Sequence, residues 1–194
     1  HHEREVGAPR ACLGHSLGEY AALVTAGVLD FDHALRLVAE RARLMGEAIP
    51  AGTGGMAAVL ALDRAAVERV CAEVADGDML VVANLNAPDQ IVVSGHLRAI
   101  ERAEPALRRA GARRIVRLQV ASAFHTPLMR PAAERLAKLL AGVPVRTPRV
   151  PVLSNATGVP HPAEPDGIRR ALAAQLVGPV QWEACMRWAI GQGG

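Results

Sequence analysis

The sequence predicts an α/β protein in which a core with a parallel sheet carries a smaller, inserted ferredoxin-like subdomain. Short Val-rich runs, typical of strands, alternate along the 194 residues with longer Ala-, Leu- and Arg-rich runs of helical composition. The middle of the chain follows the order β-α-β-β-α-β, which is that of a ferredoxin-like unit. Only 3% of the residues are aromatic, so the core must be built from alanine and aliphatic side chains.

The first core elements read as strand, sharp turn and helix. A short apolar run at residues 11–13 ends at a glycine, and a segment of helical composition follows over 16–29. A second helix is predicted over 31–49, with Asp32 near its start and Pro50 just beyond its end. The residues expected on its core face recur at helical spacing: Leu35, Val38, Ala42 and Met45.

A Gly- and Pro-rich loop at 50–55 marks the boundary of the inserted unit. We expect this subdomain over 55–119, with residues 1–54 and 120–194 forming the core. Its six elements are strand 56–62, helix 63–75, strand 80–86, strand 90–96, helix 97–111 and strand 113–120. The second helix is predicted despite the proline inside it.

The rest of the core continues with a helix over 126–143, a strand over 150–155, and two helices within 167–190 that break near Gly178. The first readable strand already leads to the candidate nucleophile, and the last helix ends where another strand could follow. We therefore expect the sequence to be a fragment of a longer fold.

Composition excludes several classes of function. Charged residues make up 21% of the chain, the net charge is +3, and the arginines are scattered, which favours solvated helix faces over a nucleic-acid surface. Three cysteines without a CxxC spacing indicate neither a disulfide framework nor a zinc site, so a cytoplasmic location is expected. No apolar run is long enough to predict a membrane span. His1 and His2 are interpreted as a tag remnant.

The segment Gly14–Gly18 matches G-x-S-x-G, in which the serine sits on a tight strand-to-helix turn. This predicts an α/β-hydrolase-like core with Ser16 as the nucleophile, the alternative being a structural serine in a glycine turn. Side chains at Gly14 and Gly18 are both expected to crowd the turn. The N–H of Leu17, at the start of the following helix, is the expected oxyanion donor.

A serine hydroxyl needs a base at neutral pH, and the chain offers several histidines for this role. His125 is favoured because it lies between a predicted strand and a predicted helix, where a loop at the sheet end would present it. His15 is adjacent to the serine and is expected to pack or make a secondary contact, His96 is distant, and His33 and His161 are expected to be solvated. No acidic residue is placed to complete a triad.

Several segments together resemble one acyltransferase family, which includes malonyl-CoA:acyl carrier protein transacylases and polyketide synthase acyltransferase domains. They are GHSLGEYAALVTAGVLDFDHALRLVAERARLM, GTGGMAAVLAL, NLNAPDQIVVSGH, SAFHTPLMRPAAERL and PVQWEACM. The resemblance implies that Ser16 attacks the thioester of malonyl-CoA with His125 as base. Coenzyme A leaves, and the phosphopantetheine thiol of an acyl carrier protein takes the malonyl group. No bound cofactor or metal is implied.

The resemblance also implies substrate-binding residues. Arg41 matches the family arginine that binds the free carboxylate of malonate, a role suited to the forked guanidinium. Phe124 matches a position tied to the choice of malonyl over methylmalonyl, with plain core packing as the alternative. Asn86 matches a position near the mouth of the site, with an Asx turn as the alternative. His15 is included as a substrate-side contact, and Asn155 is left open.

The chain departs from the family at both ends. A Gly- and Gln-rich N-terminal loop that supplies a second oxyanion donor has no match, and neither has a Gly-rich C-terminal segment that helps orient the histidine. We therefore expect poor folding or weak activity from this chain alone. Two other functions remain open: an acyl-thioester hydrolase of the same fold, and an inactive docking domain.

Overall fold

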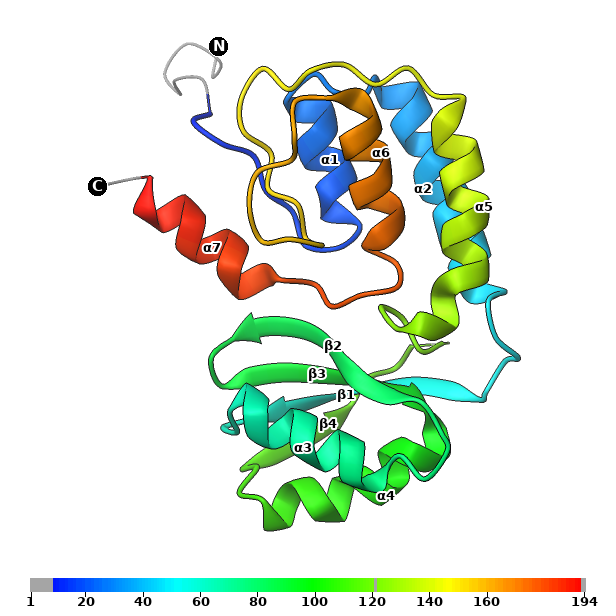
Figure 1. Cartoon of the computed structure of the whole chain (residues 1–194), viewed down its shortest axis with the longest axis vertical. Coiled ribbons are helices and arrows are strands. Elements are labelled where there is room, and N and C mark those ends of the chain that lie inside the picture. The colour runs from blue at the N-terminus through cyan, green and yellow to red at the C-terminus, as the bar shows by residue number, and fades with distance from the viewer. Residues whose placement is uncertain (1–8, 121, 193–194) are drawn as a thin grey trace.

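The computed structural model describes residues 9–120 and 122–192 of the chain, so His1 and His2 lie outside the described residues. In Figure 1 a group of helices lies above a sheet that is covered on its far side by two further helices. The elements are α1 (Gly18–Thr25), α2 (Phe31–Gly46), β1 (Gly54–Leu60), α3 (Arg64–Val74), β2 (Leu80–Ala87), β3 (Gln90–His96), α4 (Leu97–Arg109), β4 (Arg114–Arg117), a short 3-10 helix η1 (Pro127–Met129), α5 (Arg130–Ala141), α6 (Pro165–Ala174) and α7 (Trp182–Gly191).

The expected β-α-β-β-α-β order is found in the middle of the chain. The four strands form an antiparallel sheet in the order β2-β3-β1-β4, with Ala57 of β1 opposite Val93 of β3 and Arg117 of β4. Helices α3 and α4 bury a core of small and aliphatic residues against one face, among them Val67 and Ile100. The helix interrupted by proline is therefore present, because its packing outweighs the one lost backbone hydrogen bond.

The mixed α/β class is confirmed, but between the two expected core strands the predicted parallel sheet is reduced, among residues 9–120 and 122–192, to one bridge. Cys12 and Val152 form a single parallel bridge, held by hydrogen bonds from Cys12 N to Pro151 O at 2.8 Å and from Leu153 N to Cys12 O at 3.0 Å. The strands expected at 11–13 and 150–155 therefore pair with each other only at this bridge.

The helical group with α1, α2, α5 and α6 contacts the face of the sheet that α3 and α4 leave uncovered. Met56, Ala83 and Val92 form a small buried cluster there, and Phe124 packs partly against it. The loop before α7 adds to the edge of the sheet, where Val180 exchanges backbone hydrogen bonds with β2 at 2.9 Å. Helix α7 accordingly lies along β2 (Figure 1). Among the described residues, no helix has the length and hydrophobicity required to cross a membrane.

The predicted core face of α2 is wrong at two positions. Leu35 is 56% exposed and Ala42 is also exposed, Val38 is only partly buried, and Met45 alone is fully in the core. The buried stripe instead consists of Ala34, Leu37, Arg41, Leu44 and Met45. It is displaced because it contains a buried arginine, which hydrophobic periodicity assigns to the surface. The helix begins at Phe31 as predicted, with Asp30 as its N-cap accepting from His33 N, and it ends at Gly46 rather than at residue 49.

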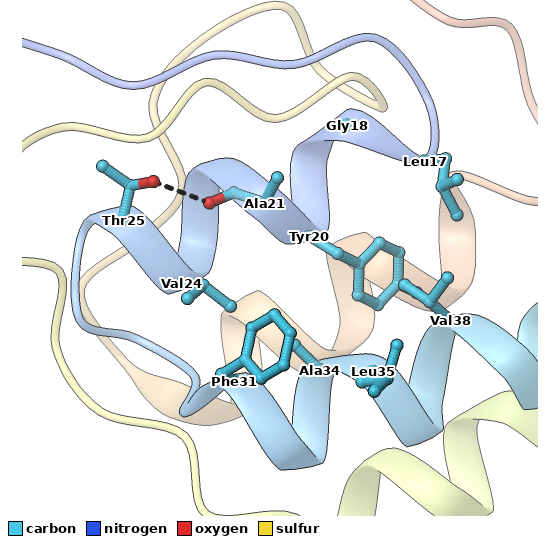
Figure 2. Close-up of a pocket in the computed structure, with 10 residues that line it drawn as sticks. All are labelled: Leu17, Gly18, Tyr20, Ala21, Val24, Thr25, Phe31, Ala34, Leu35 and Val38. Atoms are coloured by element: carbon cyan, nitrogen blue, oxygen red, sulfur yellow. Dashed lines mark hydrogen bonds between the residues drawn. The ribbon is translucent and has the colours of Figure 1, made fainter.

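The apolar side chains that α2 leaves outside the core line a groove between α1 and α2. Figure 2 shows Phe31 of α2 beside Val24 of α1, Leu35 farther along α2 near Val38, and Leu17 at the end that begins α1. The groove encloses about 450 Å³. Ser16, His125 and Arg41 are not among its lining residues, but Leu17 and Tyr20 are, so the groove adjoins the site described next.

Candidate active site

The G-x-S-x-G turn holds Ser16 in a strained conformation. Its φ of 51° lies in the left-handed region, which non-glycine residues rarely adopt. A Cβ on Gly14 would lie 2.1 Å from the carbonyl oxygen of Gly18, so a side chain is excluded at this position. A Cβ on Gly18 would meet nothing within 4 Å. The expectation that both glycines are required is therefore wrong for Gly18, because the chain has turned away from it.

Ser16 and His125 are 109 residues apart in the sequence and in direct contact. Ser16 Oγ lies 2.8 Å from His125 Nε2, and His125 Nδ1 lies 2.8 Å from the backbone carbonyl oxygen of Gln175. The carbonyl can only accept, so Nδ1 carries the proton and Nε2 is left as the acceptor for the serine hydroxyl. A main-chain carbonyl thus occupies the place of the acidic residue that sequence inspection did not find.

Burial lowers the pKa of His125 to about 4. The hydrogen bond to the Gln175 carbonyl raises this pKa, and the positive charge of Arg41 lowers it further. The imidazole is only 4% exposed and is therefore uncharged at neutral pH. That is the form able to take a proton from a serine hydroxyl.

Arg41 reaches the same hydroxyl from the buried face of α2. Its Nη2 donates to Ser16 Oγ at 2.9 Å and to Gln175 Oε1 at 2.9 Å, and the guanidinium lies 5.9 Å from the centre of the Tyr20 ring. The side chain is 5% exposed, and its Nε has no hydrogen-bond partner in the described part of the chain. Burial lowers the pKa of Arg41. A buried cation with unused donors beside the serine is suited to an anionic group.

The start of α1 leaves one N–H group open next to the serine. Gly18 N and Glu19 N donate to His15 O and Ser16 O, whereas no acceptor for Leu17 N is found within the described ranges. Leu17 is the N-cap residue of α1 and is 48% exposed. A free N–H at a helix N-terminus is suited to a developing oxyanion.

Asn155, which the sequence left open, holds the turn from behind. Its Oδ1 accepts from Ser16 N at 2.5 Å, and its Nδ2 donates to Gly14 O at 3.0 Å. The residue is fully buried. Because both side-chain atoms bind the backbone of the turn, Asn155 supports the turn that carries Ser16 and has no free group for a substrate.

The other expected substrate contacts lie on the sheet side of the site. His15 Nε2 lies 2.9 Å from Asn86 Oδ1 and 3.4 Å from Asn84 Nδ2, and its ring packs edge-on against Trp182 at 5.3 Å. Asn86 therefore makes a contact across to the turn. Phe124 is half-buried and packs against both the helical core and the cluster on the sheet. Its expected role in choosing the acyl group stays a prediction.

Three polar residues around the site were missed or misplaced by sequence inspection. Gln175, at the C-terminal end of α6, touches His125, Arg41 and Ser16, and no local pattern marks it. Glu19 is fully buried although it lies in the first turn of α1, where acidic residues are usually solvated. His161 was expected to be solvated, but its side chain is completely buried and its Nε2 lies 2.6 Å from Glu19 Oε1.

The described residues thus form a serine–histidine site of the kind that makes acyl-serine intermediates in α/β proteins. Residues 7–190 match the acyl transferase domain family, and the chain belongs to this family.

Several of the similar proteins are named for one activity. The malonyl CoA-acyl carrier protein transacylase of Escherichia coli K12 is 46% identical over 186 residues, which cover 96% of this chain and 60% of that protein. The structure of the corresponding transacylase from Coxiella burnetii superposes with a TM-score of 0.95 at 43% identity, covering 97% of this chain and 60% of that one. A malonyl-transacylase in complex with its type II polyketide acyl-carrier protein also gives 0.95 at 43% identity, covering 98% and 62%. The chain therefore spans about 60% of the length of these relatives.

Proposed function

We propose that this chain carries the site for transfer of a malonyl group from malonyl-CoA to the phosphopantetheine thiol of an acyl carrier protein. One observation carries the proposal: Ser16 Oγ contacts both His125 Nε2, at 2.8 Å, and Arg41 Nη2, at 2.9 Å. A nucleophile with its base defines acyl transfer, and a buried guanidinium beside it selects an acyl group that ends in a carboxylate.

The first half-reaction forms the acyl-enzyme. Ser16 Oγ attacks the thioester carbonyl carbon while its proton passes to His125 Nε2, and the Leu17 N–H stabilises the oxyanion of the tetrahedral intermediate. The carbon–sulfur bond then breaks, and coenzyme A leaves with the proton from His125. The product is a malonyl ester of Ser16.

The second half-reaction reverses these roles. The carrier-protein thiol gives its proton to His125 and attacks the ester carbonyl. The bond to Ser16 Oγ breaks, and the serine recovers its proton from His125. The acyl group, the carrier and coenzyme A are substrates or products, and no bound cofactor or metal takes part in these steps.

Arg41 supports malonate as the acyl group. Its Nη2 donates to neutral oxygens of Ser16 and Gln175, and an incoming carboxylate would replace these weak acceptors by a charge-assisted pair. The named activity of the relatives agrees with this choice of substrate.

We extend the proposal to the architecture and the compartment. Residues 1–54 and 120–194 are assigned to an α/β-hydrolase-like core, with the bridge between Cys12 and Val152 as part of its parallel sheet, and residues 55–119 to the inserted subdomain. Cys12, Cys71 and Cys185 are free thiols, as a reducing cytoplasm would keep them.

The alternative is hydrolysis of the same acyl-enzyme, since water can replace the carrier thiol. The partition of a preformed acyl-enzyme decides between them. The chain is loaded with radiolabelled malonyl-CoA, freed of excess reagent and mixed with carrier protein bearing its phosphopantetheine arm. Transferase function predicts label on the carrier at a rate well above its release to water. Release to water at the same rate with and without carrier would favour the hydrolase.

A further inference from the structure

Glu19 is a carboxylate with no access to solvent, and all of its contacts are inside the protein. Both Glu19 and its partner His161 have side chains that are 0% exposed, with Glu19 Oε1 lying 2.6 Å from His161 Nε2. Glu19 Oε2 accepts from Asn155 N at 2.9 Å and from Gln175 Nε2 at 2.7 Å. Burying a carboxylate is costly unless several donors satisfy it, and here three donors do so.

Two of these donors belong to residues that touch the reacting groups. Asn155 accepts the Ser16 N–H at 2.5 Å. Gln175 accepts from Arg41 Nη2 through its Oε1, and its backbone carbonyl accepts from His125 Nδ1. Glu19 is therefore connected to Ser16 through Asn155, and to His125 and Arg41 through Gln175.

The carboxylate also fixes which way the Gln175 amide points. The amide nitrogen donates to Glu19 Oε2 and, at 3.1 Å, to Ser16 O, so the amide oxygen must face Arg41. A flipped amide would place its NH2 group against the guanidinium and its single oxygen against Glu19 Oε2 and Ser16 O, which are both acceptors. Glu19 excludes that arrangement.

We propose that Glu19 is a positioning residue for acyl transfer, acting through Asn155 on the Ser16 turn and through Gln175 on His125 and Arg41. The inference deepens the proposed function and rests on it for the acyl substrate. Glu19 contacts none of the reacting atoms, and its length rather than its charge is what the three hydrogen bonds require.

The test compares Glu19→Asp with Glu19→Gln. Aspartate keeps the charge but withdraws the carboxylate by about 1.5 Å, one carbon–carbon bond, so it cannot reach His161 and the Asn155–Gln175 pair together. Glutamine keeps the reach, and its oxygen can still accept from Asn155 N and Gln175 Nε2. The readout is the second-order rate of Ser16 labelling by an uncharged fluorophosphonate, divided by the folded fraction measured by circular dichroism.

We expect Glu19→Asp to lower this rate about 10- to 100-fold, since displacements near 1 Å at reacting groups have effects of that size. Glu19→Gln should stay within about threefold of the wild type. Leu136→Val is the control: Leu136 is fully buried in the same core on α5, so this variant loses stability by packing alone and should label at the wild-type rate per folded molecule.

Equal labelling rates per folded molecule for all four proteins would overturn the proposal, and so would an equal loss in the Asp and Gln variants. The fluorophosphonate carries no malonyl group. A wild-type chain that reacts with it but accepts no malonyl from malonyl-CoA would therefore refute the proposed function while leaving the effect of Glu19 measurable.

Discussion

Ser16 Oγ lies 2.8 Å from His125 Nε2, within the range of a direct proton transfer. The contact depends on two residues with positive φ, Ser16 at 51° and His125 at 58°, so the backbone is strained on both sides of it. Such strain is typical of functional sites, because the surrounding structure must hold each side chain in its reactive orientation.

Replacement of His125, the proposed base, should lower the reactivity of Ser16 without abolishing it. His125→Ala is expected to lower fluorophosphonate labelling of Ser16 by about 10²- to 10⁴-fold, the usual contribution of a general base. Ser16→Ala should abolish labelling, which checks that the probe reacts at this residue. Labelling of the His125 variant at the wild-type rate would assign the base to another group.

The reactivity of Ser16 should survive into acid. Because the pKa of His125 is lowered to about 4, the uncharged imidazole persists below pH 6, and labelling should fall with a midpoint near 4. An acidic limb centred at about 6.5, the pKa of an exposed histidine, would contradict the burial of this side chain. Circular dichroism at each pH separates loss of reactivity from unfolding.

The same depressed pKa makes stability depend on pH. The unfolded chain, in which His125 titrates at about 6.5, binds the proton more tightly than the folded chain, where the pKa is about 4. Above about pH 6.5 neither state binds this proton. As the pH falls from about 6.5 to about 4 the unfolded chain takes the proton up first, so the folded state loses stability over that range. Urea titrations of the wild type and His125→Ala at pH 7 and pH 5 should show a smaller decrease in unfolding free energy for the variant.

Alanine substitutions at the two glycines of the turn should differ in their effect on the free energy of unfolding. Gly14→Ala would force a Cβ to within 2.1 Å of Gly18 O, and we expect it to lower the free energy of unfolding by more than about 2 kcal/mol. Gly18→Ala meets open space in the first turn of α1 and should change stability by less than about 1 kcal/mol. Thermal melts of the pair measure this, and equal losses would show that the turn requires both glycines after all.

Asn155→Ala should weaken the turn from behind. It leaves the Ser16 N–H and the Gly14 carbonyl without their side-chain partners, at an expected cost of about 1–3 kcal/mol. Thr157→Ala is the neighbouring control and should be close to neutral, because the Thr157 hydroxyl contacts Val159 O, at 3.5 Å, and not the turn. A neutral Asn155 variant would contradict the supporting role.

The sequence predicted the helices and strands well where the pattern that marks an element lies within that element. The subdomain strands and helices were predicted to within a few residues, because alternation and capping are local. Ser16 was predicted from its glycine spacing and His125 from its loop position. Arg41 was predicted only through resemblance, because periodicity treats a buried arginine as a surface residue.

The residues that were missed act through contacts far apart in the sequence. Gln175 lies 50 residues beyond His125, and His161 lies 142 residues beyond Glu19. No local pattern at these positions indicates the contact partner. The buried contacts among Glu19, His161 and Gln175 could therefore be identified only from the structure, as could the displaced core face of α2.

The most direct test of the central claim measures malonyl and acetyl loading on the wild type and on Arg41→Ala by intact mass after incubation with each acyl-CoA. If the buried guanidinium binds the free carboxylate of malonate, the variant should lose malonyl loading by about 10- to 100-fold, two charge-assisted hydrogen bonds being at stake, and should keep or gain acetyl loading. A parallel fall in both would contradict the assignment of this site to malonyl transfer.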